Sequence, residues 1–258
     1  MVGGVVTGVF AVAFGAAPAG AAGAHYVALG DSYASGVGSG SYIASSGSCD
    51  RSTLAASQLW ANAHAPSTYV SVACSGAKTT DVNANQLSAL SSTTTLVSIT
   101  IGGNDVGFST VMEDCVLYST STCVSEVNAA EQEAQTQLPG WLDTTYNGIR
   151  SHAPSARVVV VDYPRFYHDL WYCVGLSSTD RNKINEGADV LDGVIQAAAA
   201  RHGFVFADVR SAFANGHEIC DSNSWLHSVD WSDIGQSYHP TSAGQSGGYL
   251  PALTTAAG

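Results

Sequence analysis

Residues 27–40 read VALGDSYASGVGSG, a short apolar run followed by an acid, serines and four glycines. A strand that gives way to a turn and a helix has this pattern, with Ser32 just after the strand. Two chemistries use such a turn, because glycine-rich loops hold phosphates and a serine at an exposed turn can attack a carbonyl. The segment alone does not choose between them.

Five apolar, β-branched runs are spaced like the strands of a parallel sheet. They lie at 25–30, 68–73, 95–102, 156–164 and 204–209, and helix-like patterns occupy 52–65, 123–152 and 178–203. The second pattern is broken near Pro139, and the third opens on a Ser-Thr-Asp cap and ends at Gly203. We therefore predict an α/β fold, a three-layer α/β/α sandwich with a central five-stranded parallel sheet.

Length and charge limit the classes of partner. At 258 residues the chain has the size of one large domain, and we expect a single domain over 25–258. Nine Lys and Arg against 21 Asp and Glu give a net charge of −12, with no basic cluster. This balance repels nucleic acid and anionic membranes, so we expect no nucleic-acid partner and a monomer.

Residues 1–24 are small and apolar and end in Ala22-Gly23-Ala24, which matches a signal-peptide cleavage site. The usual positive start is missing, since no Lys or Arg precedes Arg51. An unrelated leader peptide is the alternative, whereas glycines interrupt the apolar part and argue against a membrane anchor. We predict a secreted, extracellular protein.

An even number of cysteines with no CxxC motif favours disulfides in an oxidising compartment. Six cysteines allow about 15 pairings, and the sequence leaves the choice among them open. Buried thiols are the alternative. No histidine has metal-ligand spacing, and we predict no metal and no cofactor. The six are Cys49, Cys74, Cys115, Cys123, Cys173 and Cys220.

Neither phosphate-binding motif fits the glycine-rich turn. A P-loop requires a Lys after its second glycine, and a dinucleotide fingerprint requires G-x-G-x-x-G, whereas this chain has Gly36-x-Gly38-x-Gly40. A nucleophilic serine instead needs a base, an oxyanion site and a group that orients the base. Candidates for these follow other predicted strands or lie near the C-terminus, because ligands bind at the carboxyl edge of open α/β sheets.

Four blocks carry a family resemblance: ALGDSYASG (28–36), ACSGAKTTDV (73–82), ITIGGNDVGF (99–108) and SYHPTSAGQ (237–245). In order and spacing they resemble those of the GDSL, or SGNH, hydrolases, whose fold is flavodoxin-like. The resemblance spans about residues 26–250 and is closest to secreted actinobacterial lipases and phospholipases. It implies a serine ester hydrolase.

The resemblance also implies a role for each matched residue. Ser32 matches the nucleophile, and His239 matches the general base. The oxyanion hole would be formed by the backbone N–H groups of Ser32 and Gly76 and by the side-chain amide of Asn104. Structural alternatives exist for each: a turn serine, a turn glycine with positive φ, a helix-capping asparagine and a packing histidine. Asp31 is expected to brace the turn through hydrogen bonds.

One position departs from the family pattern. Many members carry an Asp three residues before the histidine, and here that residue is Gln236. We predict a Ser-His dyad in which the main-chain carbonyl of Ser237 orients His239. Asp230 and Asp233 lie near enough in sequence to be alternatives, and we predict that they do not take this role.

The resemblance further implies sequential disulfides, Cys49–Cys74, Cys115–Cys123 and Cys173–Cys220, each near the site. It implies a lipid or small-ester substrate cleaved through an acyl-enzyme, with transient contact to a lipid interface. The alternatives are phospholipase A-type activity, carbohydrate acetyl esterase activity, or a non-catalytic secreted binding protein on the same fold.

Overall fold

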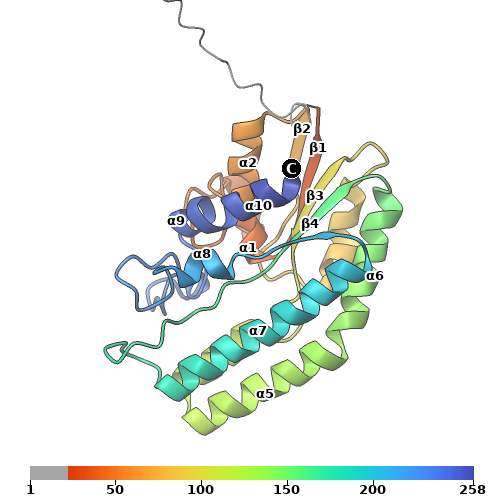
Figure 1. The fold of residues 1–258 in the computed structure, drawn as a ribbon. Coiled ribbons are helices and arrows are strands. Elements are labelled where there is room, and N and C mark those ends of the chain that lie inside the picture. Colours follow the sequence, from red (N-terminus) through yellow and green to blue (C-terminus); the bar gives the residue numbers. More distant parts are fainter. Residues whose placement is uncertain (1–22) are drawn as a thin grey trace, which may run out of the picture.

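The computed structural model describes residues 23–258 (Figure 1). The predicted signal peptide, apart from its last two residues, lies outside the described part of the chain. The strands are β1 (His25–Gly30), β2 (Thr68–Ser71), β3 (Leu96–Thr100), β4 (Arg157–Val161) and β5 (Val205–Ala207). The helices are α1 (Ser32–Ser35), α2 (Ala56–His64), α3 (Thr79–Asp81), α4 (Phe108–Leu117), α5 (Thr120–Thr136), α6 (Leu138–His152), α7 (Ser178–Arg201), α8 (Arg210–Ala214), α9 (Ser242–Gly244) and α10 (Leu250–Ala257).

The five strands form one parallel sheet in the order β2-β1-β3-β4-β5. Helices α2 and α10 cover one face, and α5, α6 and α7 lie on the other (Figure 1). The residues of β3 are buried throughout, as expected for a central strand covered on both faces. The predicted three-layer α/β/α fold with a five-stranded parallel sheet is confirmed.

Except for β1, which ends at Gly30 as predicted, the strands are shorter than their apolar runs at the carboxyl ends. The fourth run continues past Val161, but the backbone N–H of Tyr163 donates to the carboxylate of Asp192 instead of to a neighbouring strand, at 3.1 Å. Pro164 has no N–H to donate. These residues leave the sheet and form the loops at its carboxyl edge.

Two helix boundaries show how local sequence ends an element. The pattern predicted over 123–152 becomes two helices, and Pro139 lies in the first turn of α6, where its missing N–H leaves no helical hydrogen bond unmade. Helix α7 begins one residue after Ser177, whose side chain and that of Asp180 form a reciprocal capping box. Gly203 follows its end with a φ of 64°.

None of the helices within residues 23–258 has the length and apolar character needed to cross a membrane.

Gly30 closes β1 where no side chain fits. Its φ is 122°, and a Cβ there would lie 2.3 Å from the carbonyl oxygen of Thr100 on β3. The backbone of Gly30 is also held on the other side, because the Gln86 amide accepts from its N–H at 2.8 Å and donates to its carbonyl at 2.9 Å. The strand therefore cannot shift to make room.

Gly30→Ala is expected to lower the free energy of unfolding by about 3 kcal/mol or more, since it adds a backbone clash to an unfavourable φ. Gly40→Ala is the matched control, because Gly40 also has a positive φ of 73° but open space around it. Its expected cost is about 1–2 kcal/mol. Urea denaturation of both variants tests this, and equal losses would contradict the clash.

Candidate active site

Ser32 is the first residue of α1, directly after β1. Asp31 caps this helix by accepting from the Tyr33 N–H at 2.9 Å, as its expected bracing role requires. The cap and the positive φ of Gly36 at the other end confine α1 to one turn. Ser32 therefore stands at the carboxyl edge of the sheet, between β1 and β3, where the order of the strands reverses.

The structure brings His239 onto Ser32. Its Nε2 lies 2.7 Å from the Ser32 Oγ, and its Nδ1 lies 3.0 Å from the main-chain oxygen of Ser237. A carbonyl oxygen only accepts hydrogen bonds, so Nδ1 carries the proton and Nε2 is left as the acceptor for the serine hydroxyl. The ring is thereby held in the tautomer that can take a proton from Ser32.

An unusual backbone conformation at Tyr238 sets this orientation. Its φ is 67°, which costs about 1–2 kcal/mol for a residue other than glycine. Three hydrogen bonds hold Tyr238 in this conformation. Its carbonyl accepts from the Tyr33 hydroxyl at 2.7 Å, and its N–H donates to the main-chain carbonyl of His227 at 3.0 Å. Its hydroxyl also forms a hydrogen bond with the hydroxyl of Tyr167 at 2.9 Å. The turn places the imidazole of His239 over the carbonyl of Ser237.

The nearby carboxylates bond elsewhere. Asp233 accepts from the side-chain amide of Gln236, and Asp230 accepts from the backbone and hydroxyl of Ser232 at 2.9 and 2.6 Å. Neither carboxylate makes a hydrogen bond to His239 within the described chain. The geometry is that of a Ser-His pair with a main-chain acceptor.

Three candidate hydrogen-bond donors lie on the loops that follow the neighbouring strands β1, β2 and β3. The Asn104 amide donates one N–H to the carbonyl of Ala77 at 3.1 Å, which fixes the amide and leaves its second N–H available. The backbone N–H groups of Ser32 and Gly76 have no intramolecular acceptor among residues 23–258. Gly76 has a φ of 76° and open space where a Cβ would stand. Unpaired donors of this kind can stabilise an oxyanion.

Tyr163 connects the loops that carry these groups, and the sequence analysis did not identify it. Its buried hydroxyl donates to the Asp31 carboxylate and accepts from the Gly103 N–H at 3.0 Å. Burial raises the pKa of Asp31 to about 7, and the bond from Tyr163 opposes that rise. The predicted run 156–164 included Tyr163, so its place two residues past the end of β4, at the carboxyl edge of the sheet, became visible only in the structure.

A second link joins the loops after β2 and β3. Asp105 accepts from the backbone N–H of Thr79 and from its hydroxyl at 2.6 Å. Asp105 directly follows Asn104, and Thr79 lies three residues after Gly76. Their hydrogen bonds therefore hold the two loops in register. Asp105 lies within the GGND block, but only the folded structure reveals that it pairs with Thr79.

Burial, together with a smaller contribution from the neighbouring His227, lowers the pKa of His239 to about 4. The Ser237 carbonyl acts in the opposite direction because it favours the protonated ring. One edge of the half-buried imidazole faces the adjoining groove. At neutral pH the ring is therefore uncharged and able to accept a proton.

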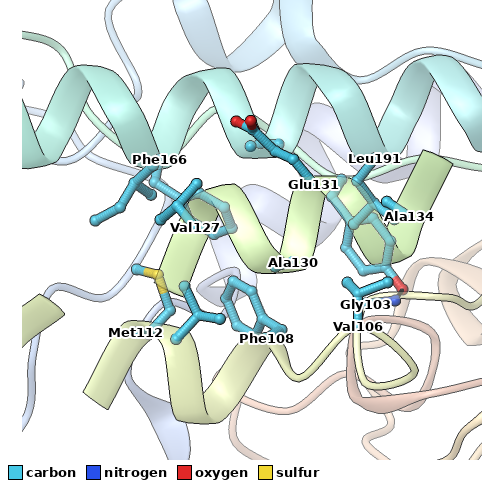
Figure 2. A pocket seen from close by; sticks show the side chains of 15 residues that line it. Gly103, Val106, Phe108, Met112, Val127, Ala130, Glu131, Ala134, Phe166 and Leu191 are labelled. Atoms are coloured by element: carbon cyan, nitrogen blue, oxygen red, sulfur yellow. Dashed lines mark hydrogen bonds between the residues drawn. The ribbon is translucent and has the colours of Figure 1, made fainter. Parts of the chain in front are cut away.

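An apolar groove of about 430 Å³ runs from His239 along α4. Its walls come from α4 and from the loop before His239, including Phe108, Met112, Val116, Leu117, Val229, Trp231 and Ile234. A smaller cavity of about 60 Å³ lies behind Phe108 and Met112, between α4, α5 and α7 (Figure 2). The Glu131 carboxylate at its border pairs with Lys183 at 2.8 Å. Apolar walls beside the Ser-His pair suit a hydrocarbon chain.

All six cysteines are paired as the family resemblance implied: Cys49–Cys74, Cys115–Cys123 and Cys173–Cys220. The first pair precedes Gly76, and the backbone N–H of Ser75 donates to the Cys49 carbonyl at 3.1 Å. The second joins α4 to α5 behind the groove. Among residues 23–258, no group of three or more His, Cys, Asp or Glu side chains could hold a metal ion.

Comparison with known proteins gives consistent matches. The model of the GDSL-like Lipase/Acylhydrolase family matches residues 28–246. A Streptomyces coelicolor protein named Lipase 1 is 58% identical over 247 residues, which are 96% of this chain and 91% of that protein.

Two solved structures are similar over nearly their whole length. Phospholipase A1 from Streptomyces albidoflavus has a TM-score of 0.88 and 54% identity, covering 91% of this chain and 99% of that one. An extracellular lipase from Streptomyces rimosus has a TM-score of 0.87 and 52% identity, covering 90% and 98%.

With His239 as the base, ester hydrolysis requires its neutral form. The activity is present above the pKa of this histidine and lost as the pH falls through it. Because that pKa is about 4, kcat/KM for a soluble ester should hold down to about pH 5 and fall about tenfold per pH unit below the pKa. Circular dichroism at each pH checks the fold. A midpoint clearly above about 6.5, the ordinary value for histidine, would indicate a carboxylate partner.

Asp230→Asn and Asp233→Asn are each expected to change kcat less than about threefold, because neither carboxylate contacts the imidazole. A carboxylate that supported the histidine would cost several orders of magnitude when neutralised. Steady-state kinetics on a soluble ester, with melting temperatures as the folding control, separates the two cases. A loss of about a thousandfold in either folded variant would refute the dyad.

Proposed function

The chain belongs to the GDSL-like Lipase/Acylhydrolase family and is an ester hydrolase, and we propose that it cleaves carboxylic esters of lipids through an acyl-enzyme on Ser32. The observation that supports this mechanism is the 2.7 Å contact between the Ser32 Oγ and the His239 Nε2. A hydroxyl and a neutral imidazole at this distance form the nucleophile and base of an acyl-transfer site.

In the first half-reaction the Ser32 Oγ attacks the ester carbonyl carbon while its proton moves to the Nε2 of His239. The carbonyl oxygen becomes an oxyanion, which accepts from the N–H groups of Ser32 and Gly76 and the amide of Asn104. Collapse of the tetrahedral intermediate breaks the bond to the alcohol. His239 donates its proton to the departing alkoxide, and the acyl group remains on Ser32.

In the second half-reaction a water molecule replaces the alcohol. His239 takes one proton from this water, and the resulting hydroxide attacks the acyl-Ser32 carbonyl. The proton then returns to the Ser32 oxygen as the carboxylic acid departs. Throughout both steps the Nδ1–H of His239 donates to the carbonyl of Ser237, whose dipole stabilises the transient imidazolium less than a carboxylate does.

The groove beside His239 supports a lipid acyl group as the substrate. Its walls are mostly apolar and favour a hydrocarbon chain, whereas only Ser109, Glu113 and a few residues beside His239 offer polar groups to a sugar. Phospholipase A-type activity is the second candidate, and the similarity to the S. albidoflavus phospholipase A1 supports it. Neutral glycerides are favoured over anionic phospholipids, because the sequence around the groove carries no Lys or Arg.

Secretion is part of the proposal. Three disulfides indicate an oxidising compartment, and the similar S. rimosus lipase is described as extracellular. We further propose that residues 1–24 are a signal peptide and that 25–258 form one domain. The acidic charge argues against a nucleic-acid partner, and we further propose that the protein is a monomer.

Ser32→Ala should reduce kcat for p-nitrophenyl esters by at least about four orders of magnitude, because it removes the nucleophile. His239→Ala should have a similar effect. Asn104→Ala removes one oxyanion donor and should cost about 10²–10³ in kcat with KM nearly unchanged. A serine-reactive phosphonate should label the wild type at Ser32, as peptide mapping would show.

The substrate class is tested by comparing glycerides of increasing acyl length, phosphatidylcholine and acetylated sugars. Long-chain glyceride or phosphatidylcholine esters should be preferred, and Ser32→Ala should be inactive on all of them. A strong preference for acetylated sugars would refute the lipid substrate but not the mechanism. Absence of both turnover and labelling would indicate a binding protein on this fold.

A further inference from the structure

The loop between β4 and α7 exposes large apolar side chains. Trp171 is 94% exposed and Val174 is 90% exposed, while Tyr172 is about half exposed. The rings of Trp171 and Tyr172 pack edge to face, with 5.5 Å between their centroids, and both rings face solvent. The loop projects past the start of α7 (Figure 1). Isolated exposed apolar residues are common, but three within four positions are not.

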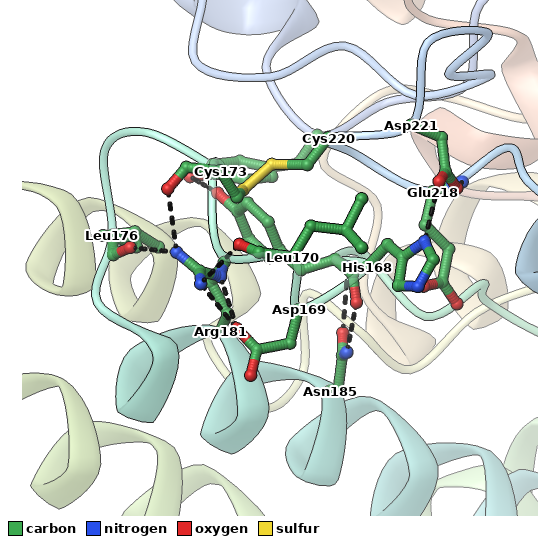
Figure 3. Close-up of a disulfide and its surroundings, with 12 residues drawn as sticks. His168, Asp169, Leu170, Cys173, Leu176, Arg181, Asn185, Glu218, Cys220 and Asp221 are labelled. Carbon is green, nitrogen blue, oxygen red and sulfur yellow. Dashed lines mark hydrogen bonds and ion pairs between the residues drawn. A yellow bond between two sulfur atoms is a disulfide. The ribbon is translucent and has the colours of Figure 1, made fainter.

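This loop is firmly held, so the exposure is a feature of the fold. The guanidinium of Arg181, on α7, is buried beneath the loop and donates to the carbonyls of Leu170 at 3.3 Å, Cys173 at 3.2 Å and Leu176 at 2.5 Å (Figure 3). It also pairs with the carboxylate of Asp169.

The disulfide Cys173–Cys220 ties the tip of the loop to the segment after α8 (Figure 3). A loop anchored by three carbonyl bonds, an ion pair and a disulfide has little freedom left to lose on binding. It therefore presents Trp171 and Val174 at a low entropic cost.

The loop flanks the mouth of the active-site groove. At its start, Tyr167 bonds the hydroxyl of Tyr238, the neighbour of His239, at 2.9 Å. Just past its end, in the first turn of α7, Asp180 accepts from the Thr120 hydroxyl at 3.1 Å. Thr120 is the first residue of α5 and lies three positions after Leu117, which ends α4 and lines the groove. The loop is thus held on one side by a groove residue and on the other by the segment that follows α4.

Other exposed apolar side chains lie on those same segments. Leu117 ends α4 and Tyr118 follows it, while Trp231 and Ile234 lie on the groove wall opposite α4. All four are more than half exposed. We refer to the set as the apolar rim: Leu117, Tyr118, Trp171, Tyr172, Val174, Trp231 and Ile234.

The charges around the rim are of one sign. The segments 113–119, 169–177 and 229–238 contain Glu113, Asp114, Asp169, Asp230 and Asp233 but no Lys or Arg. The cations nearest in sequence to the loop are each paired with a carboxylate: Arg165 with Asp189, Arg181 with Asp169 and Lys183 with Glu131. An anionic surface would be repelled, whereas an uncharged or zwitterionic one would not.

We propose that the apolar rim is the surface by which this protein docks on neutral or zwitterionic lipid aggregates, with the loop 169–176 as its rigid anchor. The inference rests on the proposed lipid substrate. Trp and Tyr side chains are suited to the boundary between hydrocarbon and headgroups. Docking there turns the groove toward the lipid, so an acyl chain can enter it without crossing water. The acids bordering the rim remain in the aqueous phase.

The test measures co-flotation with phosphatidylcholine vesicles, using Ser32→Ala protein so that the lipid stays intact. Adding Trp171→Ser and Val174→Ser is expected to lower the partition coefficient at least about tenfold, since burial of one such side chain contributes that much. Val70→Ser is the matched control, because Val70 is also exposed but lies on the edge strand β2. It should leave partitioning unchanged.

Two further measurements identify what binds to the apolar rim. Phosphatidylglycerol vesicles should bind more weakly than phosphatidylcholine vesicles at low salt, and added salt should not release the protein from phosphatidylcholine. Unchanged partitioning of the double variant would overturn the proposal, as would salt-sensitive binding to phosphatidylglycerol alone. Loss of self-association in sedimentation, without loss of vesicle binding, would instead assign the rim to a second copy.

The experiments distinguish an error in the proposed docking surface from an error in the proposed function. Flotation needs no turnover, and hydrolysis of a soluble ester by the wild type needs no lipid surface. Equal melting temperatures of the variants confirm that any loss of binding is not a loss of fold.

Discussion

The site depends on one constraint, that parallel strands end at the same edge of a sheet. Because β2, β1 and β3 are neighbours in that order, the loops carrying Gly76, Ser32 and Asn104 meet although they are far apart in sequence. Backbone N–H groups at these ends have no strand to pair with, which leaves donors available. Buried side chains then hold the loops in register, most directly Tyr163 and Asp105.

The histidine illustrates how a main-chain group can replace a carboxylate. Orienting His239 through Ser237 requires Tyr238 to adopt a left-handed backbone conformation, and hydrogen bonds from its own backbone and side chain offset that cost. A carbonyl carries no net charge, so it raises the pKa of the imidazole less than an aspartate would. The imidazole of His239 is consequently neutral over a wide pH range, and its protonated form receives less stabilisation.

The molecule has few charged residues, most of them acidic, and several of its exposed apolar side chains lie together on one part of the surface. Most large apolar side chains are buried in the core around the sheet, and several of the exceptions gather where the groove opens. A rigid loop and a disulfide hold part of this surface in place, and the basic residues nearest to it in sequence are all paired. Affinity for an interface would then depend on apolar area, while the surrounding acids select against anionic lipid.

Patterns of short range in the chain were sufficient for the fold class, the five strands and the breaks at Pro139 and Gly203, because periodicity and capping act between residues a few positions apart. The four motif blocks likewise gave Ser32, Gly76, Asn104 and His239 as the candidate site residues. Folding was needed to reveal Tyr163 and Arg181 as partners of distant loops, and to establish which group faces the second nitrogen of His239. The physical reason is that such contacts depend on distances in space that no local sequence pattern encodes. Asp233 lies only six residues before His239, yet its carboxylate bonds Gln236, and the His239 Nδ1 bonds the Ser237 carbonyl instead.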